Sequence, residues 1–128
     1  MIIFLTFCLS GCGAPNQTEL THPDFSVQYI CTNGYHSRTK YPIITVIHSS
    51  SKLDAYYARN KDLYDLEHNE NPASDYTIGF LDSADTYDNN FFASNVLVLV
   101  LLEEPSGSNR HAVKDIYADP TSLNILVE

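Results

Sequence analysis

Seven consecutive apolar residues, Val96 to Leu102, constrain the fold of this chain more than any other feature. A strand with one wet face alternates apolar and polar side chains, whereas a strand covered on both faces is apolar along its whole length. The run ends at Glu103, where a turn containing Pro105 and Gly107 is predicted. We therefore expect a strand over 96–102 that is buried on both faces, or nearly so.

Other segments predict the rest of an antiparallel sheet. Phe25 to Thr32 alternates, with Phe25, Val27, Tyr29 and Cys31 on one face, and Asn33-Gly34 is a turn signal that could open a hairpin. The β-branched residues 43–47 predict a second strand. Residues 110–117 and 122–127 are expected to complete a three-stranded meander with 96–102, turning at Asp119-Pro120.

Helical spacing appears in the middle of the chain. Leu53, Tyr56, Tyr57, Leu63, Tyr64 and Leu66 predict a main helix over 52–67, and Ser51 with Asp54 resembles its capping box. A short strand is expected over 76–81 and a short helix over 82–92. The predicted fold class is α+β, an antiparallel sheet with one main helix and one short helix packed on a face.

The N-terminal apolar run, Ile2 to Leu9, is too short to span a membrane but fits the apolar region of an export signal. It leads into Leu9-Ser10-Gly11-Cys12, which looks like the motif at which a lipoprotein signal peptidase cleaves before a diacylglyceryl-modified cysteine. We expect a lipid anchor on Cys12 and a location at the extracytoplasmic face of the cell membrane. The alternative is a buried apolar N-terminal strand followed by a chance Leu-Ser-Gly-Cys.

This motif predicts the domain organisation. Residues 1–11 are expected to be a lipoprotein signal peptide, 12–24 a lipidated tether, and 25–128 a single α+β domain. No Lys or Arg precedes Cys12, so we expect the true start upstream of Met1. After lipidation Cys31 has no partner for an intramolecular disulfide and is expected to be a small buried apolar residue.

Charge and motif content exclude several functions. A net charge of −9 argues against a nucleic-acid partner, because phosphate binding needs clustered Lys and Arg. The five histidines lack metal-ligand spacing. Asp82, Asp85 and Asp88 are best explained as a solvated helix face, and most of the nine tyrosines as core residues. Glu103 and Glu104 are adjacent, so on a strand their side chains would point to opposite faces and could not act together as a pair of catalytic acids. No catalytic residue, metal or cofactor is predicted.

The segment from Phe91-Phe92 and Asn95 through Glu103-Glu104-Pro105-Ser106-Gly107-Ser108 to Arg110 resembles a motif of small uncharacterised lipoproteins from Gram-positive bacteria. The strand from Tyr41-Pro42 to Ser49, followed by Leu53 and Tyr56-Tyr57, fits the same pattern. A weaker similarity is to the C-terminal domain of a lipoprotein subunit of a surface protease complex, which has a Gly-Gly-Tyr type turn where Ser106-Gly107-Ser108 stands here. That similarity implies a protease-associated or protein-binding module with the 103–109 turn near the contact.

Three hypotheses for the function follow. The first is a non-enzymatic binding or accessory lipoprotein with an envelope protein as partner. Its candidate contact turn comprises Glu103, Glu104, Ser106, Gly107, Ser108 and Arg110. The second is a small surface hydrolase in which His48 and His111, both at predicted strand ends, come together. The third is a purely structural envelope protein.

Overall fold

Strand β4 (Asn95–Leu101) lies inside a four-stranded antiparallel sheet with the strand order β2-β1-β4-β3. The computed structural model describes residues 1–8, 20–33, 39–67, 79–103, 111–119 and 121–128. Residues 96–101 are all buried, as the unbroken apolar run predicts. A central strand has sheet neighbours on both edges and other layers on both faces, which leaves no position for a polar side chain.

The other central strand is β1 (Ile2–Cys8), which pairs with β2 (Phe25–Ile30) on one edge and with β4 on the other. The side chains of Ile2, Ile3, Phe4 and Leu5 are inaccessible to solvent. Alternate residues point to opposite faces, so Ile2 and Phe4 join one core cluster and Ile3 and Leu5 join the other. The first five residues therefore belong to the hydrophobic core of the described fold.

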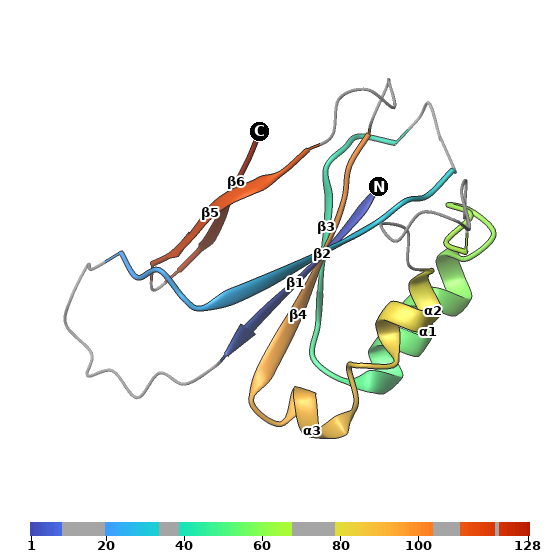
Figure 1. Cartoon of the computed structure of the whole chain (residues 1–128), viewed down its shortest axis with the longest axis horizontal. Coiled ribbons are helices and arrows are strands. Elements are labelled where there is room, and N and C mark those ends of the chain that lie inside the picture. Colours follow the sequence, from blue (N-terminus) through green and yellow to red (C-terminus); the bar gives the residue numbers. More distant parts are fainter. Residues whose placement is uncertain (9–19, 34–38, 68–78, 104–110, 120) are drawn as a thin grey trace.

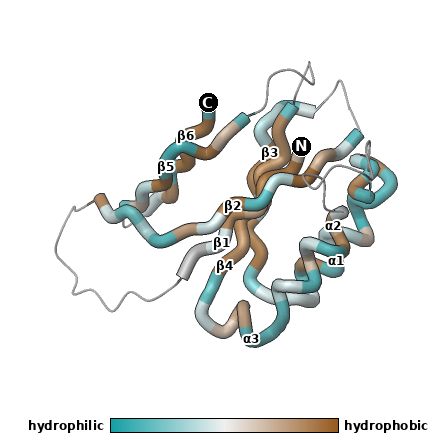
Figure 2. The backbone as a smooth tube through the Cα atoms, viewed as in Figure 1, coloured by the Kyte–Doolittle hydropathy of each residue, from teal (hydrophilic) through white to brown (hydrophobic). Residues whose placement is uncertain are grey.

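Three helices cover one face of this sheet: α1 (Ser50–Asn60), α2 (Phe80–Ala84) and α3 (Asn89–Phe92) (Figure 1). Leu53 of α1 and Phe80 of α2 contact Ile2, Phe4 and neighbouring sheet residues in the larger core cluster. Figure 2 shows the hydrophobic residues concentrated along the strands between the layers. The predicted α+β class is confirmed, with the helices packed on strands.

A two-stranded hairpin, β5 (Val113–Ala118) and β6 (Leu123–Val127), covers the opposite face. Ile116 is fully buried against Ile3, Leu5, Val98 and Val100. The Asp119 carboxylate accepts hydrogen bonds from the backbone N–H groups of Thr121 and Ser122 at 2.7 and 2.8 Å, which holds the turn. The predicted strand pair and turn are confirmed, but sequence patterns did not reveal that this hairpin forms a separate layer.

Two predicted strand pairings are wrong. The meander would pair β4 with β5, but both edges of β4 are occupied by β1 and by β3 (Ile43–Ile47). A hairpin opened at Asn33 would pair β2 with β3, but these strands lie at opposite edges of the sheet. The strands themselves were predicted from local sequence patterns, whereas their pairing partners depend on the insertion of β1 between β2 and β4.

The main helix is shorter than predicted. α1 begins after Ser49, whose hydroxyl accepts from the Lys52 N–H at 3.3 Å, so the N-cap lies two residues before the predicted Ser51. It ends at Asn60, and the following turn includes Asp65 with a φ of 45°, which an α-helix cannot contain. Tyr64 and Leu66 are buried as predicted, but they belong to this turn and not to a helix.

The segment after residue 78 also differs from prediction. Residues 76–78 lie outside the described part of the chain, and Phe80 and Leu81 are helical instead of extended. The Glu67 carboxylate accepts from the Leu81 N–H at 2.9 Å and stabilises the start of α2. The expected helix over 82–92 is divided, because Asp88 accepts from the Phe91 N–H and caps a second helix, α3.

Candidate functional site

The candidate contact turn falls mostly outside the described residues. Glu104, Ser106, Gly107, Ser108 and Arg110 lie there, as does the predicted lipidation residue Cys12. Glu103 is described and exposed after β4, and its carbonyl oxygen lies 3.2 Å from the Nε2 atom of His111. Among the described residues, the structure brings Glu103 close to His111, which follows the predicted turn.

The aspartates and tyrosines singled out from the sequence lie at helix ends or pack against the core. Asp82 is in α2, Asp85 ends it and Asp88 caps α3, so the three carboxylates do not share one helix face as predicted. Tyr56 and Tyr57 pack against the Phe80 ring, and Tyr87 stacks on Phe4. Burial raises the pKa of Tyr56 to about 12, with a smaller contribution from Tyr64. Tyr87 lies in the core and Tyr56 and Tyr57 pack against it, as the sequence predicted, whereas Tyr29 is 38% exposed.

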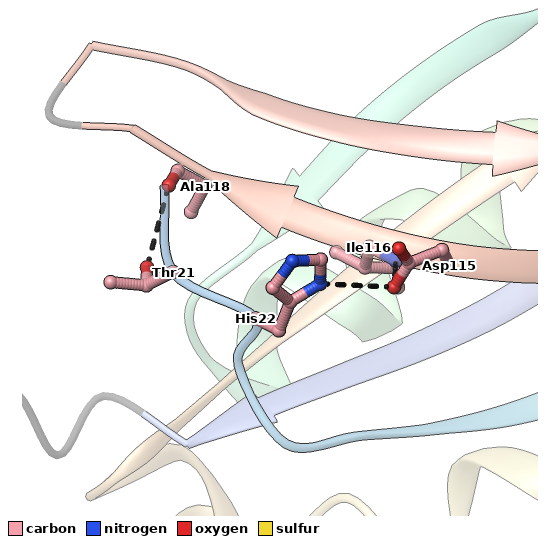
Figure 3. Close-up of polar contacts among 5 residues, drawn as sticks. All are labelled: Thr21, His22, Asp115, Ile116 and Ala118. Atoms are coloured by element: carbon pink, nitrogen blue, oxygen red, sulfur yellow. Dashed lines mark hydrogen bonds and ion pairs between the residues drawn. The ribbon is translucent and has the colours of Figure 1, made fainter. Parts of the chain in front are cut away.

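A histidine–aspartate contact not predicted from the sequence links the segment before β2 to the hairpin (Figure 3). The His22 Nδ1 atom lies 3.2 Å from the Asp115 Oδ1 atom, with the two side chains 63% and 44% exposed. Beside it, Thr21 and Ala118 exchange backbone hydrogen bonds of 2.9 and 2.8 Å. Asp115 Oδ1 also accepts from the Ile116 N–H at 2.8 Å.

This contact fastens the hairpin to the sheet rather than forming a reaction centre. An exposed contact of this kind contributes at most about 1 kcal/mol, and the two main-chain hydrogen bonds between Thr21 and Ala118 hold the same segments together. Within the described ranges, no group of three or more His, Cys, Asp and Glu could hold a metal ion. No local pattern could have indicated the pair, since 93 positions separate its members.

The most exposed apolar surface on the sheet is at strand β3. The side chains of Ile44 and Val46 are 57% and 49% exposed. They are in register with Val100 and Val98 of β4, which are almost completely covered. Directly opposed residues of an antiparallel pair point to the same face, so Ile44 and Val46 continue the face on which the hairpin packs. The hairpin covers that face over β4 but leaves its β3 margin open.

Strand β3 is also an edge strand. It pairs with β4 on one side, and no strand within the described residues pairs with its other side. Proteins protect such edges with charged residues, prolines, bulges or covering segments, but Ile43–Ile47 holds neither charge nor proline and pairs with β4 without a register shift. We call Ile44, Val46 and the unpaired side of β3 the β3 edge surface.

Comparisons with known proteins give no relative: no family model, curated protein or solved structure matches the chain. The lipoprotein-family resemblance therefore stays a prediction. None of the described helices is long and apolar enough to cross a membrane.

Proposed function

We propose that this protein is a non-enzymatic protein-binding module that accepts an extended segment of a partner along the β3 edge surface. The observation that carries the proposal is the exposure of Ile44 and Val46 on an edge strand with no described strand beyond it. Among the functions weighed from the sequence, a binding or accessory module fits this surface best. The proposed contact site is therefore β3 and not the 103–109 turn that the sequence suggested.

Strand addition uses two kinds of interaction that β3 offers. The backbone N–H and C=O groups on an open edge can pair with an extended peptide, and alternate peptide side chains can pack on the exposed apolar residues. Burying an apolar side chain completely contributes about 1.5–3 kcal/mol, so covering the half-exposed Ile44 and Val46 would contribute about 1 kcal/mol each. The main chain would supply affinity, and the spacing of Ile44 and Val46 would supply specificity.

The direct test is titration with a fluorescein-labelled peptide of sequence Gln-Gln-Thr-Val-Thr-Val-Thr-Gln-Gln, followed by anisotropy. We expect saturable binding and slowed amide hydrogen exchange in β3. The double variant Ile44→Gln, Val46→Gln should weaken binding at least tenfold. The matched control Leu81→Gln, Leu126→Gln removes two exposed leucines elsewhere and should bind like the parent. No binding up to about 1 mM, or equal loss in both variants, would contradict the proposal.

The predicted lipid anchor calls for its own experiment. Cleavage before Cys12 would remove β1, and β2 and β4 would each lose a neighbour. The complete burial of Ile2 to Leu5 supports the alternative weighed from the sequence, so we infer that residues 1–11 remain in the folded protein. Intact-mass analysis of protein from its native cell tests this inference. A mature chain that begins at an acylated Cys12 would overturn it and would support an extracytoplasmic, membrane-anchored protein with an envelope partner.

A further inference from the structure

We propose that the segment bound at the β3 edge surface is an extended peptide with an apolar centre and acidic residues on both flanks. This inference rests on the proposed function and names its partner class. It is motivated by the two exposed lysines that flank β3 and by the charge of the sequence stretch that contains β3, which differs from that of the chain as a whole.

The chain is strongly acidic, but the stretch of sequence that contains β3 is not. Residues 25–53 contain none of the 16 Asp and Glu residues and three of the seven Lys and Arg residues. β3 lies within this stretch at the sheet edge (Figure 1). The stretch of chain that carries β3 is therefore free of acidic residues and basic in sequence, although the net charge of the whole chain is −9.

Two lysines flank the strand. Lys40 lies three positions before β3, and Lys52 lies in the first turn of α1, five positions after the end of β3. Both side chains are exposed, and neither forms an ion pair within the part of the chain that the structure describes. Five strand residues span about 17 Å, so carboxylates just outside a five-residue core would come within reach of these long side chains.

A second copy of this chain is a poorer occupant. Antiparallel self-pairing centred on Thr45 would align Ile44 with Val46 but would also bring Lys40 opposite Ser50 of the second copy. Ser50 is two residues from Lys52, so cations would approach cations, and two chains of net charge −9 would be joined. A peptide with acidic flanks avoids the approach of cations to cations, and its carboxylates can pair with both Lys40 and Lys52.

The experiment compares three labelled peptides that share the core Thr-Val-Thr-Val-Thr and carry two Asp, two Gln or two Lys residues at each end. In low salt the Asp-flanked peptide should bind about 2- to 10-fold more tightly than the Gln-flanked one, given two exposed ion pairs. The Lys-flanked peptide should bind most weakly. Raising the salt to about 0.5 M should remove these differences, because exposed charges are screened.

The double variant Lys40→Gln, Lys52→Gln should abolish the preference for the Asp-flanked peptide while leaving Gln-flanked binding intact. The control Arg59→Gln, Lys61→Gln carries the same charge change and should keep the preference. Equal binding of the three peptides, or equal loss in both variants, would overturn the inference and leave the proposed function standing. Binding of none would sink the proposed function itself. Concentration-dependent dimerisation that Ile44→Gln, Val46→Gln abolishes would assign the edge to a second copy instead.

Discussion

The Phe4 ring of β1 meets the Phe80 ring of α2 edge to face, with their centroids 5.1 Å apart. Phe4 also stacks on Tyr87 at 5.6 Å, and both phenylalanines are inaccessible to solvent. This contact joins a residue of the predicted signal peptide to the helical layer, so it places the first strand at the centre of the packing.

The substitution Phe4→Ala should therefore lower the free energy of unfolding by about 3–5 kcal/mol, because it removes a buried ring and leaves a cavity. The control Phe25→Ala changes a ring that is 36% exposed at the edge strand β2 and should cost much less. Urea titrations followed by circular dichroism measure both. Similar losses for the two variants would show that Phe4 is not a core residue.

Deletion of residues 1–11 reproduces the product of the predicted signal-peptide cleavage, apart from the lipid. We expect this chain to lose cooperative unfolding, because β2 and β4 no longer have β1 between them. Thermal melts and dispersion of amide NMR signals report the outcome. A truncated chain that melts as sharply as the full chain would show that β1 is dispensable and would favour the lipoprotein hypothesis.

The N-cap of α1 distinguishes the observed helix start from the predicted one. Ser49→Ala removes the hydroxyl that accepts from the Lys52 N–H and should cost about 1 kcal/mol. Ser51→Ala removes the hydroxyl at the predicted cap and should cost little, since that residue lies inside the helix. Equilibrium urea unfolding of the two variants would contradict this assignment if Ser51→Ala were the more destabilising.

The hairpin turn should be sensitive to acid. Hydrogen bonds from Ser122 and Thr121 hold the pKa of Asp119 at about 2, below the ordinary value of 3.8. A carboxyl whose folded pKa is lowered stabilises the fold above pH 3.8, and this contribution disappears as pH falls toward 2. The stability difference between the parent and Asp119→Ala should therefore shrink over that interval. A difference that stays constant from pH 5 to pH 2, or an ordinary NMR titration of Asp119, would contradict the prediction.

The sequence predicted only part of the β3 edge surface. The β-branched residues 43–47 predicted a strand, and the structure confirms it as β3. Nothing in that stretch indicated that it ends the sheet or that Ile44 and Val46 remain exposed. Those properties follow from the strand order and from how far the β5–β6 layer extends. The predicted turn over 103–109 could not be compared in the same way, because most of it lies outside the described residues.

Local pattern alone determined the strands β2 to β6, the main helix and the turn at Asp119, since alternation, helical spacing and capping involve neighbours in the chain. Partner choice was decided only in three dimensions. The apolar residues Ile2 to Phe7 have the composition of an export signal and of a central strand alike, and their pairing with both β2 and β4 could not be predicted from that composition. Contacts between distant segments depend on which surfaces remain to be buried, and that information is spread over the whole chain.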